Sequence, residues 1–207
     1  MGRLAVLGAS GHGKVVADVA ECCGWKTVEF FDDDTSVKNH SIGCWSVVGS
    51  INDFILSSTL YDGVVVAIGN NLVRRKICED LLSKNINLVS LVHPAAVVSR
   101  YAQLCAGCVI VAGAVINPYA CIGRGCIINT NASVDHDCWL GDYVHISPGV
   151  SLAGGAKIGD GTWIGIGACV KQLITIGSFV TVGAGAVVVK DVSDHSTVAG
   201  VPARPIR

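Results

Sequence analysis

Residues 122–164 read IGRGCIINTNASVDHDCWLGDYVHISPGVSLAGGAKIGDGTWI, and every sixth residue of this stretch, counted from its first, is aliphatic. The same column of Val, Ile or Leu continues without a break from Val98 to Val188. A second column lies four residues after the first and holds mostly small residues, such as Ala132 and Cys138. Repeats that cannot bury their own apolar face must stack to form a core. The stretch therefore predicts a solenoid of short parallel strands.

A period of six also predicts the geometry of the coil. Three such repeats make one triangular turn, with the aliphatic side chains inside and glycine or asparagine at corners that need a positive φ. Residues one turn apart then stack at the spacing of neighbouring strands, about 4.8 Å. Gly154 lies one such turn after His136. The next turn is therefore expected to have no side chain over this histidine.

The first half of the chain has a different pattern, in which strands alternate with helices. We expect strands at residues 4–7, 27–31, 64–68 and 88–92, and helices at residues 15–23, 51–56 and 72–83. This alternation predicts a small parallel sheet of the Rossmann type. On the last helix, Arg74, Arg75 and Lys76 are expected on or near the polar side. The predicted domains are residues 1–92 and residues 93–207.

Composition excludes several classes of protein. The net charge is −1 and charged residues make up 15% of the chain, so nothing points to nucleic acid. The longest apolar runs, such as residues 64–68, are too short to span a bilayer. Ser10, His12 and Lys14 interrupt the N-terminus, so we expect no signal peptide and a cytoplasmic protein. The ten cysteines are then expected to be reduced, and no metal site is predicted.

Several motifs carry a resemblance to a known family. The repeated (Leu/Ile/Val)-Gly-x-x-x-x pattern resembles the left-handed parallel β-helix acyltransferases, and the ending Gly200-Val-Pro-Ala-Arg204 resembles their C-terminal signature. Four shorter motifs are similar to one branch of that family, namely Gly8-Ala-Ser-Gly-His-Gly13, Asp32-Asp33, Ala67-Ile-Gly-Asn-Asn71 and Val134-Asp-His-Asp-Cys138. That branch acetylates sialic acid or amino sugars on nucleotide carriers. The best match is to the UDP-4-amino-sugar N-acetyltransferases of the bacillosamine type.

The resemblance implies a fold and partners. The expected fold is an N-terminal Rossmann-like small parallel sheet followed by a left-handed parallel β-helix of about five coils, although ordinary parallel crossovers are right-handed. Acetyl-CoA is the implied co-substrate. Family members pack as trimers with acetyl-CoA between neighbouring subunits, so a homotrimer is expected.

His136 is the candidate general base, because an imidazole with an ordinary pKa near 6.5 suits proton removal at neutral pH. Asp137 is expected to orient it; the family usually has Glu there, and Asp135 is an alternative. Direct transfer is predicted, because Cys108, Cys126 and Cys138 fall in the inward column and are poorly placed for an acyl intermediate.

Other candidates are assigned to the two substrates. The candidates for acetyl-CoA binding are an oxyanion donor, small and apolar residues that would line a groove, and two cations for the CoA phosphates: His145, Gly154, Gly165, Ile166, Gly183, Ala184, Lys190 and Arg204. Those for the nucleotide sugar lie mostly at expected strand ends, where open α/β sheets bind ligands: Ser10, Gly11, His12, Asp32, Asp33, Gly69, Asn70 and Asn129.

The predicted function is N-acetyl transfer from acetyl-CoA to a UDP- or dTDP-linked 4-amino-4,6-dideoxy sugar. Two alternatives stay open. One is O-acetylation of sialic acid, in which His136 activates a hydroxyl, and the other is a non-catalytic scaffold that binds nucleotide sugars. A dehydrogenase would rest only on the turn at Gly8–Gly13, which is G-x-x-G-x-G and not the dinucleotide fingerprint.

Overall fold

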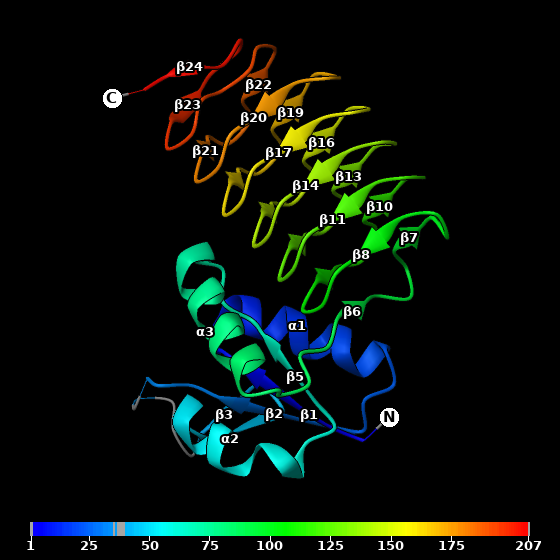
Figure 1. Cartoon of the computed structure of the whole chain (residues 1–207). Helices are drawn as coiled ribbons and strands as arrows, with labels where there is room; N and C mark the ends of the chain where they lie inside the picture. Colours follow the sequence, from blue (N-terminus) through cyan, green and yellow to red (C-terminus); the bar gives the residue numbers. More distant parts are fainter. Residues whose placement is uncertain (1, 35, 37–39, 207) are drawn as a thin grey trace. The chain divides into compact units, whose positions relative to one another are not determined.

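The computed structural model describes residues 2–34, 36 and 40–206, and the chain divides into two compact units, Met1–His93 and Pro94–Arg207. The first unit is an α/β layer structure and the second is a left-handed parallel β-helix, as predicted (Figure 1).

The first unit is built on a sheet with the strand order β3-β4-β2-β1-β5. Its elements are β1 (Arg3–Leu7), α1 (Gly11–Cys22), β2 (Thr27–Phe31), β3 (Ser41–Ile42), β4 (Trp45–Gly49), α2 (Ile51–Ser57), a 3₁₀ turn (Ser58–Leu60), β5 (Gly63–Val66), α3 (Asn71–Ser83) and β6 (Leu91–Val92). All pairs are parallel except β3 with β4. The carboxyl ends of β1, β2 and β5 therefore share one edge, as the sequence predicted.

Neighbouring residues of β2 place helices on opposite faces of this sheet. Phe30 packs so close to α1 that a Cβ added at Gly13 would lie 3.1 Å from its ring, whereas the ring of Phe31 lies 5.3 Å from that of Phe54 in α2. Successive strand residues point to opposite faces, so α1 and α2 cover different sides. Helix α2 begins at a capping box, in which the side chains of Ser50 and Asp53 accept from each other's backbone N–H groups.

The structure departs from the sequence analysis of this unit in three places. Strands β3 and β4 were not predicted. Helix α1 begins at Gly11, so Gly11 and His12 belong to its first turn and not to a free loop. Arg74 does not lie on the polar side of α3; it is 1% exposed.

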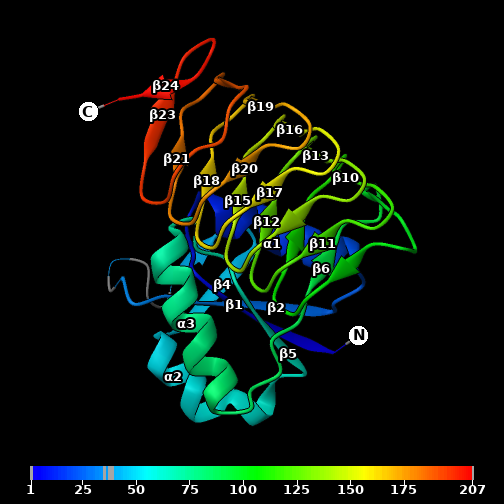
Figure 2. The same ribbon diagram turned by 45° about the horizontal axis from the view of Figure 1, so that its top comes forward.

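The second unit is a stack of triangular coils made of two-residue strands (Figures 1 and 2). The first side holds β7 (Val97–Val98), β10 (Val115–Ile116), β13 (Ser133–Val134), β16 (Ser151–Leu152), β19 (Cys169–Val170) and β22 (Val187–Val188). The second side holds β8 (Gln103–Leu104), β11 (Cys121–Ile122), β14 (Trp139–Leu140), β17 (Lys157–Ile158) and β20 (Thr175–Ile176). The third side holds β9 (Val109–Ile110), β12 (Ile127–Ile128), β15 (His145–Ile146), β18 (Trp163–Ile164), β21 (Thr181–Val182), β23 (Thr197–Ala199) and the antiparallel β24 (Arg204–Pro205).

The register of the coils is the one that the period predicts. Val134 pairs with Leu152, and Leu140 pairs with Ile158, in each case one full turn later. The aliphatic column is buried from Ile110 to Val188, with Val134 and Ile158 fully buried, whereas Val98 and Leu104 in the first coil are partly exposed. Because the pairing is unbroken, the position of any corner residue fixes its neighbours above and below.

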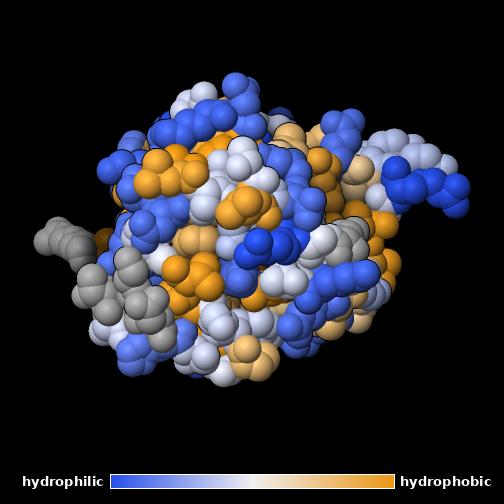
Figure 3. Space-filling view, turned by 90° about the horizontal axis from the view of Figure 1, so that it is seen from below, coloured by the Kyte–Doolittle hydropathy of each residue, from blue (hydrophilic) through white to orange (hydrophobic). Residues whose placement is uncertain are grey.

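No helix among the described residues is long and apolar enough to cross a bilayer. On the face drawn in Figure 3, hydrophilic and hydrophobic residues are interspersed in small areas.

Candidate active site

His136 lies at the corner between β13 and β14, and its ring is held by the next residue. Its Nδ1 lies 2.7 Å from Oδ2 of Asp137. Asp137 reaches the ring because it adopts the left-handed conformation, with a φ of 57°. The hydrogen bond to Asp137, with the charge of Asp135, raises the pKa of His136 above its ordinary value of 6.5. The short arm of Asp137 is therefore sufficient to contact the imidazole.

Asp135 has a different role at the same corner. Its Oδ1 accepts from the backbone N–H of His136 and from Nδ2 of Asn117, each at 2.8 Å. Asn117 lies one coil earlier, so this bond ties two coils together. The Asn117 hydrogen bond, followed by that from the His136 backbone, lowers the pKa of Asp135. Asp135 thus fixes the backbone of the corner while Asp137 holds the ring.

Gly154 covers the imidazole, as the eighteen-residue register predicted. A Cβ added to Gly154 would lie 2.6 Å from both Cε1 and Nε2 of His136. The backbone N–H of Gly155 donates to the carbonyl of His136 at 2.9 Å, which fixes the two coils in this register. The space beside Nε2 is open only because residue 154 has no side chain.

A cavity of about 440 Å³ opens on the third side of the β-helix. Six of the predicted site residues line it, namely Asn129, His145, Gly165, Ile166, Gly183 and Ala184. Its other lining residues are Ser147, Pro148, Trp163, Thr181 and Val182. The wall is largely apolar and includes Ile166, which is 58% exposed. Such a groove suits a flexible, mostly uncharged chain with a few polar groups.

His145 is fixed by its neighbours in this cavity. Its ring stacks on that of Trp163 in the next coil, with centroids 5.9 Å apart and planes 10° from parallel. Its Nε2 lies 3.4 Å from Nδ2 of Asn129. Trp163 in turn donates from Nε1 to Oγ of Ser147 at 2.8 Å. Asn129, predicted to bind the sugar, is thus a neighbour of His145.

The two basic residues that were predicted to bind CoA phosphates lie together near the end of the β-helix. Lys190 and Arg204 line a second cavity of about 280 Å³, beside Asp191 and Ser193. Arg204 also donates from Nη1 to the carbonyl of Ala203 at 2.9 Å.

In the first unit, the predicted nucleotide-sugar residues follow β1, β2 and β5. Ser10 precedes α1 and its side chain makes no capping bond, whereas Asn70 caps α3 by accepting from the N–H groups of Leu72 and Val73. Gly11 opens α1, and Gly69 is exposed with open space where a side chain would lie.

The two aspartates after β2 both hold loops in place. Asp32 accepts from the N–H groups of Ala9, at 2.6 Å, and Asp34, at 2.8 Å. Asp33 accepts from the N–H of Ile51 at 2.9 Å. Each uses a carboxylate oxygen in the local structure of the sheet edge, and their contact with a nucleotide stays a prediction.

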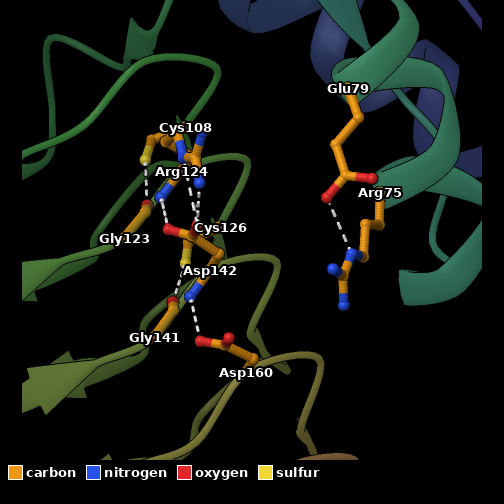
Figure 4. A network of polar contacts seen from close by, with 9 residues as sticks. All are labelled: Arg75, Glu79, Cys108, Gly123, Arg124, Cys126, Gly141, Asp142 and Asp160. Atoms are coloured by element: carbon orange, nitrogen blue, oxygen red, sulfur yellow. Dashed lines mark hydrogen bonds and ion pairs between the residues drawn. The ribbon is translucent and has the colours of Figure 1, made fainter.

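The inward cysteines form hydrogen bonds between neighbouring coils. The thiols of Cys108, Cys126 and Cys138 donate to carbonyl oxygens of the next coil at 3.1 to 3.3 Å, and Thr162 makes the same bond at the equivalent place. Figure 4 shows two of these thiols, pointing at Gly123 and Gly141. Burial raises the pKa of Cys138, which keeps this thiol protonated.

A ladder of aspartates runs beside these thiols at another corner. Arg124 donates from Nε and Nη2 to Asp142, and the N–H of Asp142 donates to Asp160 at 2.8 Å (Figure 4). Both carboxylates are therefore used to join coils. Among the described residues, no group of three or more His, Cys, Asp or Glu could hold a metal ion.

Comparison with known proteins agrees with this architecture. Residues 3–81 match the family model of the PglD N-terminal domain. The acetyltransferase domain of PglB from Neisseria gonorrhoeae, solved with acetyl coenzyme A, is 44% identical, with 99% of this chain and 98% of that chain covered and a TM-score of 0.95. This chain belongs to the hexapeptide-repeat, acetyl-CoA-dependent N-acetyltransferases of the bacillosamine type.

Two further relatives extend the comparison. PerB from Caulobacter crescentus, solved with CoA and GDP-perosamine, is 38% identical, with 100% of this chain and 98% of that chain covered and a TM-score of 0.92. UDP-N-acetylbacillosamine N-acetyltransferase of Bacillus subtilis is 37% identical over 114 residues, which are 54% of this chain. The match spans about half of that protein's length, 52%.

Sequence reasoning missed some of the residues at these sites. Trp163 was not among the predicted site residues, although its outward position one coil after His145 places the two rings in register. Ser147 and Thr181 share the same side of the coil and could have been found from that register. Arg74 carried no such signal, because its burial depends on the packing of α3.

Proposed function

We propose that this acetyltransferase moves the acetyl group of acetyl-CoA to the amino group of a nucleotide-linked 4-amino-4,6-dideoxy sugar. The observation that carries the proposal is the exposed imidazole of His136, held at Nδ1 by Asp137 and left open at Nε2 by Gly154. A sugar amine needs a base of this kind, because the protonated amine cannot attack a thioester.

The hydrogen bond to Asp137 selects the tautomer of the base. With its proton on Nδ1, His136 presents an unprotonated Nε2 on the side that Gly154 leaves open. Nε2 takes the proton as the amine attacks the thioester carbonyl, and Asp137 stabilises the imidazolium that results. The tetrahedral intermediate collapses with departure of the CoA thiolate. No covalent enzyme intermediate is needed, in keeping with the buried thiols.

The cavity on the third side is the proposed place for the pantetheine arm. Ile166 supplies apolar contact, and Gly165, Gly183 and Ala184 present backbone to the groove. His145 is the proposed donor to the developing oxyanion. Lys190 and Arg204 are the proposed partners of CoA phosphates. The acetyl coenzyme A complex of the neisserial relative supports the choice of ligand.

The proposed active site needs more than one copy of the chain. His136 lies at the corner where the first and second sides meet, whereas the cavity with His145 lies on the third side. A corner of a triangular coil faces away from the opposite side, so one β-helix cannot present both groups to one substrate. A homotrimer, in which neighbouring subunits bring the two together, is therefore part of the proposal.

The nucleotide sugar is assigned to the first unit. Ser10, Gly11 and His12 at the start of α1 are the proposed phosphate-side contacts, with Asp32 or Asp33 and Gly69 and Asn70 near the ribose or base. UDP or dTDP is the proposed carrier; the Caulobacter relative was solved with GDP-perosamine, so GDP is the alternative to test. A cytoplasmic location stays a prediction.

The test is acetylation of a panel of acceptors by the purified protein. UDP-, dTDP- and GDP-linked 4-amino sugars are incubated with acetyl-CoA, next to free and CMP-linked sialic acid, and products are identified by mass spectrometry. The proposal expects an amide on a UDP- or dTDP-amino sugar. An acetyl ester on sialic acid would instead favour O-acetylation, and a protein that binds no acetyl-CoA would be a scaffold.

A further inference from the structure

Arg74 is a buried cation at the carboxyl edge of the sheet. It lies on the first turn of α3, and only 1% of its surface is exposed. Its Nη1 donates to the carbonyls of Ile68, at 2.9 Å, and Gly69, at 3.2 Å, and its Nη2 donates to the side chain of Asn71 at 2.8 Å. Burying a guanidinium is costly unless its donors are satisfied. These bonds hold the charge against the loop that follows β5.

This loop packs against the loop that follows β1. A Cβ added to Gly8 would lie 2.9 Å from the carbonyl oxygen of Ala67 and 2.9 Å from the side chain of Ile68. Gly8 has a φ of 112°, which also favours glycine. The close approach brings the start of α1 next to the segment that Arg74 holds.

The charge of Arg74 also affects His12, which lies in the first turn of α1. Its burial, together with the positive charge of Arg74, lowers the pKa of His12 to about 4. His12 is therefore neutral at physiological pH. Arg74 supplies a buried positive charge to this region, whereas Lys14 in the first turn of α1 is exposed to solvent. The amino end of α1 adds a partial positive charge on the same side.

We propose that Arg74 is a positioning residue that shapes the loop of residues 68–71 and whose buried charge makes this edge of the sheet selective for the diphosphate of a nucleotide sugar. It acts through the loop and through space, where the low dielectric of the interior strengthens its field. The inference rests on the proposed function, which assigns the nucleotide sugar to this edge.

The experiment compares charged and uncharged forms of the same nucleotide on three variants. Arg74→Gln removes the positive charge. Arg74→Lys keeps the charge but replaces the planar guanidinium group with an ammonium group. Arg75→Gln is the matched control, because Arg75 is the next residue on α3 but is exposed and pairs with Glu79 at 2.8 Å (Figure 4). Binding of UDP and uridine, with the GDP and dTDP pairs in parallel, is measured by calorimetry, and KM for acetyl-CoA is measured by CoA release.

Arg74→Gln is expected to weaken binding of the diphosphate about tenfold while nucleoside affinity and the KM for acetyl-CoA change less than about twofold. Arg74→Lys is expected to keep the wild-type ratio of diphosphate to nucleoside affinity even if both fall, and Arg75→Gln to behave as wild type. Equal losses for diphosphate and nucleoside in Arg74→Gln, or a lost ratio in Arg74→Lys, would overturn the proposal. If the wild type binds acetyl-CoA but no nucleoside diphosphate, the proposed function fails as well; if it binds one and Arg74→Gln binds it equally well, only this inference fails.

Discussion

Replacing Gly154 with alanine is expected to slow acetyl transfer without unfolding the β-helix. The new Cβ would lie 2.6 Å from Cε1 and Nε2 of His136, where ordinary contacts are 3.4–4 Å. The imidazole must therefore move by about 1 Å, and it can, because the side chain is 60% exposed. That movement would disturb its 2.7 Å contact with Asp137. A misplacement of about 1 Å can cost on the order of 100-fold in rate, so kcat should fall by about that factor.

Stability should respond much less. Gly154 does not have a left-handed φ, so alanine fits its backbone and should change the free energy of unfolding by less than about 1 kcal/mol. Gly149→Ala is the matched control with the opposite pattern, since Gly149 has a φ of 67° and open space around it. It should cost about 1–2 kcal/mol with unchanged kcat. The assays are CoA release by chromatography and denaturant unfolding. A folded Gly154→Ala variant with kcat within about twofold of wild type would refute the reasoning.

Three further predictions follow from the same sites. Asp137→Asn removes the main cause of the raised pKa of His136, so the acidic limb of the kcat–pH profile, below which the base is protonated, should move to lower pH; an unmoved limb would assign it to another group. Ile166→Ser should raise the KM for acetyl-CoA about tenfold with little effect on stability, because the exposed side chain loses roughly 1–2 kcal/mol of apolar contact; an unchanged KM would remove it from the groove. Cys138→Ala should keep kcat within about threefold, since the buried thiol donates to the carbonyl of Ala153; a burst of acyl-enzyme in the wild type that disappears together with activity in the variant would instead support covalent catalysis.

The β-helix was predictable because its register follows directly from the six-residue repeat in the sequence. Once Val134 and Leu152 are assigned to the inward column, the position of Gly154 over His136 follows, and the structure confirms it. The same repeat places His136 at the corner between the first and second sides of the coil and His145 on the third side. The contact of the ring with Asp137 agrees with the expectation, but the sequence could not exclude Asp135, because the choice depends on the φ of a single corner residue.

The first unit was less predictable because its details depend on tertiary packing. Strand β3 has only two residues and lies at the edge of the sheet, where periodicity is weak. Strand β4, Trp45–Gly49, is paired on both sides but ends in glycine and was not assigned from the sequence. Arg74 has the sequence context of a surface residue, because it begins the basic run Arg74-Arg75-Lys76. Its burial follows from hydrogen bonds to the carbonyls of Ile68 and Gly69, which only the folded loop provides.

The most direct test of the account is a single-turnover measurement with His136→Ala. Wild type and variant are mixed with acetyl-CoA and the acceptor found in the panel, and the N-acetylated sugar is followed by mass spectrometry at a pH above the raised pKa of His136. The account predicts that the variant folds and binds both substrates but forms product at least about 100-fold more slowly. A variant that forms the amide within about threefold of the wild-type rate would contradict the assignment of His136 as the base.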